Sequence, residues 1–126
     1  NLEYYVGFSK KATRSLVSLS SYVLERDTKG AEIFGMPGTT KRAEVVAGAV
    51  ELSQIAGLID LQPRGIEGKL LKDGQFNIFA VIGKNGEVRD VNVIWYADYR
   101  EWRVECARRD EQSIWCSGSQ VFSNQL

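Results

Sequence analysis

Alternating apolar and polar residues begin at Phe76 and continue through the C-terminal half of the chain. Because successive side chains of a β-strand point to opposite faces, this pattern predicts strands with one buried face. Asn85-Gly86 is a preferred sequence for a two-residue hairpin turn, and a second turn is expected at Asp98-Tyr99. Consecutive antiparallel strands follow, and this requirement restricts the fold more than any other feature of the sequence.

A third turn, centred on Glu111, extends the arrangement to a fourth strand. The three turns together define one buried face with three cross-strand rows, which are Phe76/Trp95/Trp102, Ile78/Val93/Val104/Gly118 and Ala80/Val91/Cys106/Cys116. A slip of one residue in any register would send the side chains of that strand to the opposite face. The C-terminal half is therefore predicted to be a four-stranded antiparallel β-meander.

Apolar residues three and four positions apart predict two helices before the meander, over residues 5–27 and 40–59. Gly30 is expected to end the first helix, and Thr39 or Thr40 to cap the second. Both helices are expected to cover the apolar face of the sheet, because that face must be buried against another layer.

The predicted fold class is α+β, with two N-terminal helices packed on one face of a four-stranded antiparallel β-meander. A chain of 126 residues suits a single domain. Its helical half is expected to span residues 1–62, and its β-meander residues 63–126.

The chain contains no histidine, which excludes Ser-His and Cys-His nucleophile pairs and most zinc sites. Sixteen basic and sixteen acidic residues give zero net charge, which argues against a general nucleic-acid binder. We therefore expect a non-enzymatic protein with no catalytic residues, no metal and no cofactor, whose partners are proteins.

The predicted register places Cys106 directly opposite Cys116. Opposed residues of antiparallel strands lie close enough for a disulfide. A disulfide would indicate an extracytoplasmic location, in the periplasm, at the cell surface or outside the cell. The alternative is a pair of buried thiols in a cytosolic core.

Three large apolar residues interrupt the otherwise polar outer face of the predicted sheet: Phe79, Ile94 and Trp115. They are expected to be scattered surface residues, which is common in soluble proteins. The alternatives are a patch that binds a protein partner, or a face covered by residues 62–74.

Glycines, a proline and threonines lead into the second predicted helix, in the run "GMPGTTKR". Its spacing differs from that of a phosphate-binding P-loop. A capped turn is therefore expected here. The alternative is an anion site at the start of the helix, formed by Thr39, Thr40, Lys41 and Arg42.

The order of helix, loop region and four-stranded meander with a late disulfide resembles the soluble domain of type IV pilins and of type II secretion pseudopilins. The opening "NLEYYVGFSKKATRSL" is similar to the stretch where the long helix of that family leaves its membrane-inserted half. The resemblance implies a filament or pseudopilus subunit of the cell envelope that assembles through its N-terminal helix. It also implies a membrane anchor upstream of Asn1.

A second hypothesis is a small secreted or periplasmic binding module with a cystatin-like or NTF2-like arrangement of helix on sheet. Such a module would act as an inhibitor or an immunity protein through the Phe79, Ile94 and Trp115 face or through its loops. The sequence upstream of Asn1 would distinguish the two hypotheses. A pilin-like anchor needs about 20 apolar residues there, whereas a secreted module needs a cleavable signal.

Overall fold

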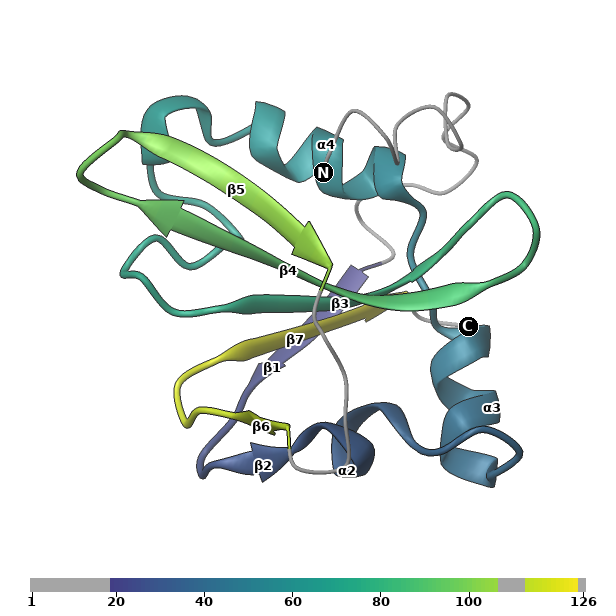
Figure 1. Cartoon of the computed structure of the whole chain (residues 1–126). Helices are drawn as coiled ribbons and strands as arrows, with labels where there is room; N and C mark the ends of the chain where they lie inside the picture. The colour runs from purple at the N-terminus through teal and green to yellow at the C-terminus, as the bar shows by residue number, and fades with distance from the viewer. Residues whose placement is uncertain (1–18, 107–112, 125–126) are drawn as a thin grey trace.

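A five-stranded mixed sheet forms the centre of the protein (Figure 1). The computed structural model describes residues 19–106 and 113–124. The strands of the main sheet, in spatial order, are β1 (Leu19–Val23), β7 (Gln120–Asn124), β3 (Asn77–Ile82), β4 (Val88–Tyr96) and β5 (Glu101–Cys106). A second, two-stranded sheet pairs β2 (Thr28–Lys29) with β6 (Ile114–Trp115).

Helical segments connect the second strand to the third. They are α2 (Gly30–Phe34), α3 (Thr40–Ala47), α4 (Leu52–Asp60) and the 3-10 turn η2 (Pro63–Gly65). Figure 1 shows α4 on one side of the main sheet, and α2 and α3 on the other. The described part of the chain therefore forms three layers, with the sheet in the middle.

The prediction of two N-terminal helices packed on a four-stranded antiparallel meander is wrong. The C-terminal strand β7 does not extend a meander but lies between β1 and β3, antiparallel to the first and parallel to the second. Helices cover both faces of the sheet instead of one. A parallel neighbour needs a long crossover connection, and the pattern of local turns carries no information about such a pairing.

The helix predicted over residues 5–27 is contradicted at its C-terminal end, where residues 19–23 form β1. Residues 5–18 lie outside the described part of the chain. The sequence "LSSYV" contains residues that favour strands, and its backbone is paired with β7 from Leu19↔Asn124 to Val23↔Gln120. This pairing partner is about a hundred residues away in sequence, so the helical spacing alone was misleading.

The second predicted helix, residues 40–59, is broken into α3 and α4. Between them Val50 forms a parallel bridge with Val81, in which the Val50 amide donates to Ala80 O at 2.8 Å. At the end of α3, Gly48 lets β7 approach closely, because a Cβ at this position would lie 3.3 Å from Asn124 O. Thr39 caps α3 as predicted, since its side chain accepts a hydrogen bond from the Arg42 amide.

The predicted register of the β3–β4 hairpin is wrong by one residue. The Gly83 amide donates to Glu87 O at 2.7 Å, and Gly86 has a φ of 82°. This geometry is a longer turn followed by a bulge at a left-handed glycine, rather than a two-residue turn. Phe79 therefore faces Val91, whereas the prediction placed Ala80 there.

The register of the β4–β5 hairpin is confirmed. The observed pairs include Trp95↔Trp102, Val93↔Val104 and Val91↔Cys106. The predicted partner of the next strand is wrong, because β6 pairs with β2 and leaves β5 at the edge of the main sheet.

Two hydrophobic cores lie on the two faces of the sheet. The core beneath α4 joins Leu52, Ile55 and Leu58 to Phe79 and Phe122, whose rings stack with centroids 4.6 Å apart. The core beneath α2 and α3 contains Leu24, Ile33, Phe34, Ile78, Ala80 and Val121. Five of the six residues of β3 are buried, as expected for a strand covered on both sides.

We predict that Phe79→Ala destabilises the protein by about 3–5 kcal/mol, because it removes a fully buried ring and leaves a cavity. Ile114→Ala is the control, since Ile114 is 58% exposed and should change stability by less than about 0.5 kcal/mol. Urea unfolding followed by circular dichroism measures both. Equal effects in the two variants would contradict the placement of Phe79.

Candidate functional site

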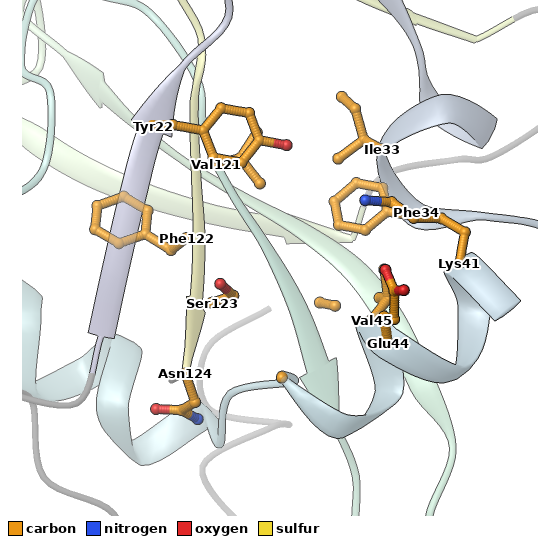
Figure 2. Close-up of a pocket in the computed structure, with 12 residues that line it drawn as sticks. Tyr22, Ile33, Phe34, Lys41, Glu44, Val45, Val121, Phe122, Ser123 and Asn124 are labelled. Atoms are coloured by element: carbon orange, nitrogen blue, oxygen red, sulfur yellow. The ribbon is translucent and has the colours of Figure 1, made fainter. Parts of the chain in front are cut away.

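An apolar pocket opens between the main sheet and the α2–α3 layer (Figure 2). Its cavity volume is about 200 Å³. Strand β7 supplies Val121, while α2 supplies Ile33 and Phe34. The lining continues with Tyr22, Lys41, Glu44, Val45, Gly48, Ala80, Phe122, Ser123 and Asn124.

Small residues at the bottom of the pocket leave its volume unfilled. Ser123 on β7 and Ala80 on β3 contribute short side chains, and Gly48 at the end of α3 contributes none. Ser20 on β1 lies directly opposite Ser123, with their hydroxyl oxygens 3.5 Å apart. Larger residues at these positions would fill the space between sheet and helix.

The tight connection between α2 and α3 holds the apolar wall in place. Gly35 has a φ of 68°, and a Cβ there would lie 2.6 Å from the Arg42 amide nitrogen. A glycine is therefore required for the chain to turn this closely. The turn directs Ile33 and Phe34 toward the sheet, where both side chains are buried.

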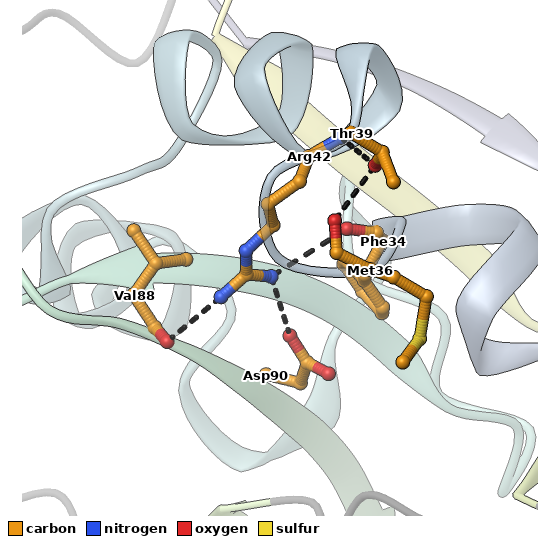
Figure 3. A network of polar contacts seen from close by, with 6 residues as sticks. All are labelled: Phe34, Met36, Thr39, Arg42, Val88 and Asp90. Atoms are coloured by element: carbon orange, nitrogen blue, oxygen red, sulfur yellow. Dashed lines mark hydrogen bonds and ion pairs between the residues drawn. The ribbon is translucent and has the colours of Figure 1, made fainter. Parts of the chain in front are cut away.

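Arg42 fastens α3 to the sheet (Figure 3). Its guanidinium donates to Val88 O at 3.3 Å and to Phe34 O at 3.5 Å, and lies 4.0 Å from Asp90 Oδ1. The Asp90 side chain is 5% exposed, so the Arg42 guanidinium is a nearby opposite charge for a carboxylate that solvent hardly reaches. Arg42 thus links α2, α3 and β4.

The four residues of the predicted anion site are used differently in the structure. The Thr39 hydroxyl caps α3 and donates to Met36 O at 2.7 Å, while Arg42 points inward. Thr40 is exposed, and Lys41 lines the apolar pocket. The capped turn, which was the expected interpretation, is confirmed. The helix start does not gather the four side chains around one point.

The three residues of the predicted partner face do not form one patch. Phe79 is fully buried beneath α4. Trp115 packs against the opposite core, and its ring meets Phe76 edge-on at 5.3 Å. Ile94 is half-buried on β4. The expectation that all three are scattered surface residues is therefore wrong for Phe79.

The predicted disulfide is not formed. Cys106 ends β5, Cys116 follows β6, and both are exposed thiols that no bond joins. The pairing failed because β6 belongs to the second sheet, so the assumption that placed the two cysteines opposite each other does not hold. The alternative of two buried thiols is also wrong.

A second hollow, of about 500 Å³, lies between residues 72–74 and residues 94–98, which form the end of β4 and the start of the turn that follows it. Nearby, the Arg103 guanidinium stacks 3.9 Å from the centre of the Tyr96 ring and 5.0 Å from that of Tyr99. Glu101 Oε2 lies 3.4 Å from Arg103 Nε and neutralises the cation. This hollow runs between surface turns, whereas the pocket beside Tyr22 lies between the main sheet and the α2–α3 layer.

Polar groups stand at the rim of the apolar pocket. The side chains of Tyr22, Lys41 and Glu44 are exposed and carry the ionisable groups of the described lining. Within residues 19–106 and 113–124, no group of three or more cysteine, aspartate and glutamate residues is arranged to hold a metal ion. The helices in these ranges are all too short or too polar to span a bilayer.

Sequence reasoning did not identify this pocket. Its lining comes from β1, α2, α3, β3 and β7. Of these elements, β1 was predicted as part of a helix, and no element was predicted over the residues of α2 and β7. Gly48, Ala80 and Ser123 are small enough to leave space for a pocket. The sequence does not show that they lie close together, because this requires β7 to lie between β1 and β3.

Partial burial raises the pKa of the Tyr22 phenol above its ordinary value of 10.0. The folded protein therefore keeps a proton that the unfolded chain loses, so the contribution to stability is complete below pH 10 and is lost as pH rises through the raised pKa. We predict that Tyr22→Phe weakens the fall in stability at alkaline pH. Urea unfolding of both proteins from about pH 8 to 11 measures this, and parallel curves would contradict it.

The chain matches no family model, no curated protein and no solved structure. The geometry of the pocket and the contacts that hold it open are therefore the grounds on which a function can be proposed.

Proposed function

We propose that this protein is a non-enzymatic binding module that takes up a ring-sized apolar group in the pocket between β1–β7 and α2–α3. The observation that carries the proposal is the pocket itself, whose walls include Ile33, Phe34, Val45 and Val121. The sequence hypothesis of a small binding module is kept, but its site moves from the sheet face and loops to this pocket.

The size of the pocket limits what it can hold. A water molecule occupies about 30 Å³ in the liquid, and an apolar cavity of about 150 Å³ can bind benzene. The 200 Å³ observed here therefore suits one aromatic ring or one branched aliphatic side chain. Burying such a group against apolar walls supplies about 25 cal/mol for each square ångström removed from water.

The polar side chains at the rim of the pocket would orient a bound ligand. Lys41 and Glu44 carry opposite charges three residues apart on α3, and the Tyr22 phenol stands on the β1 side (Figure 2). A ligand with an apolar group and a polar attachment fits this arrangement, since the polar part remains at the solvent side. Amino-acid side chains presented by a protein or peptide have this form.

Two features of the chain bear on whether this pocket binds a ligand or catalyses a reaction. The chain has no histidine, and the ionisable side chains of the described lining are exposed at the rim rather than buried beside the apolar walls. Catalytic acids and bases are usually tuned by burial within a cleft. These features favour binding over catalysis.

The pilin-like hypothesis stays a prediction. Its architectural basis was an N-terminal helix, a four-stranded meander and a disulfide. Residues 19–23 are a strand, the sheet is mixed, and the cysteines are not joined. The extracytoplasmic location also stays a prediction, without the disulfide that motivated it.

Titration with small aromatic probes, together with a variant whose new side chain fills the pocket, tests the proposal. We predict that small aromatic probes such as benzene, indole and N-acetyl-phenylalanine amide shift the amide NMR signals of Tyr22, Val45 and Val121 in the wild type. Ser123→Phe should reduce the affinity for these probes at least tenfold, because the added ring occupies the floor of the pocket. Ser117→Phe is the matched control, since Ser117 is an exposed serine in the β6–β7 turn and does not line the pocket.

Melting curves of the two variants establish that both are folded before titration. Wild-type protein that shows no shifts at the solubility limit of every probe would overturn the proposal. Undiminished binding by Ser123→Phe would overturn it as well.

A further inference from the structure

The two edges of the main sheet differ in chemistry. Strand β5 carries Glu101, Arg103 and Glu105, and alternating charges of this kind discourage pairing with another strand. Strand β1, at the other edge, has the sequence "LSSYV" and no charged residue. An uncharged edge strand is a template for the addition of a further strand.

The main-chain groups of β1 alternate between β7 and the open edge. The Leu24 amide donates to Ser119 O at 2.8 Å and continues the β1–β7 register. Because hydrogen-bonding residues alternate in an antiparallel pair, Ser20 and Tyr22 direct their main-chain groups to β7. Leu19, Ser21 and Val23 therefore direct theirs away from the sheet, where no described strand follows.

Apolar side chains accompany this open backbone. Tyr22 is 53% exposed and Val23 is 49% exposed, although they are neighbours on opposite faces of the strand. Leu19 is half-buried against the core beneath α4. Both faces of the edge therefore offer apolar surface beside main-chain donors and acceptors.

We propose that two copies of this chain associate through β1, in antiparallel orientation, with a two-fold axis at Ser21. The two five-stranded sheets then form one continuous sheet. This register pairs Ser21 with Ser21 and Leu19 with Val23, all of them residues whose main-chain groups point outward. The hydrogen-bonding alternation of both strands is satisfied at the same time.

The side chains of β1 are complementary to themselves in this register. Leu19 of one copy faces Val23 of the other, which forms an apolar cross-strand pair on one face. On the opposite face, the small Ser20 faces the large Tyr22. The same fit occurs twice, as an interface with two-fold symmetry requires.

The association also affects the pocket. Ser20 borders Ser123 on the pocket floor, so Tyr22 of the second copy lies at the open side of the pocket and contributes a second phenol to its rim. The dimer does not depend on the ligand, and a ligand site that failed the probe titration would leave this inference untouched.

A designed cross-link tests the register. Residues that exchange both hydrogen bonds lie about 5.5 Å apart at Cα, within the range of a disulfide. Ser21→Cys, in a Cys106→Ser and Cys116→Ser background, is expected to form a disulfide-linked dimer under mild oxidation. Ser123→Cys in the same background is the control, because Ser123 is exposed but lies on the inner strand β7. Equal cross-linking of the two variants would overturn the proposed register.

Sedimentation velocity with reduced thiols tests the association itself. The wild type is expected to shift from monomer to dimer with increasing concentration. Val23→Lys should weaken the dimer at least tenfold by placing a charge opposite Leu19. Ile114→Lys is the matched control, since it adds the same charge at an exposed apolar residue on β6.

A wild type that stays monomeric at high micromolar concentration would overturn the proposal and favour a strand of another protein as the occupant of this edge. A Val23→Lys variant that dimerises as strongly as Ile114→Lys would also overturn it.

Discussion

The pairing of β7 between β1 and β3 is the interaction on which the rest of the structure depends. It joins the first and last described strands across about a hundred residues, and it places Phe122 and Val121 on opposite faces of the sheet. Phe122 stacks on Phe79 in the core beneath α4, whereas Val121 belongs to the core beneath α2 and α3. One strand thus completes both cores, and its removal would open both.

The position of the candidate site follows from this pairing. Strand β7 brings Val121 and the small Ser123 beneath α2 and α3, and the helices are held above them by Gly35 and by the Arg42 contacts with Val88 and Phe34. The same pairing leaves β1 at the edge of the sheet, beside the mouth of the pocket. The proposed ligand site and the proposed dimer interface therefore share β1 as a common boundary.

A polar residue in a strand can be buried when its side-chain amide finds hydrogen-bond partners. Asn77 stands between Phe76 and Ile78 of the predicted buried face, so the alternating pattern places it on the polar outer face. In the structure it is fully buried, and its side-chain amide donates to Leu71 O and Val93 O at 3.0 Å. Its oxygen accepts from the Leu71 amide at 2.8 Å. Such a residue reads as surface in a period-two pattern, because the pattern reports polarity and not whether hydrogen-bond partners exist.

How well each element could be predicted depends largely on how close in sequence its interacting residues are. The β4–β5 register was predicted because a short turn determines it and both strands lie within twenty residues of each other. The Thr39 cap was predicted for the same reason, since it involves residues three positions apart. The β3–β4 register failed by one residue because the preferred turn at Asn85-Gly86 competes with a bulged turn closed by Gly83 and Glu87. The resulting shift moved Phe79 from the surface to the core.

By itself, the sequence determined the α+β composition, the Thr39 cap and the β4–β5 hairpin with its register, because these depend on neighbouring residues. The tertiary structure alone decided that residues 19–23 are a strand, that β7 lies parallel to β3, and that Cys106 and Cys116 are not joined. It also decided that a pocket exists beside Tyr22. Each of these outcomes requires contacts between segments distant in sequence, and the free energy of such contacts outweighs local preference without leaving a periodic pattern.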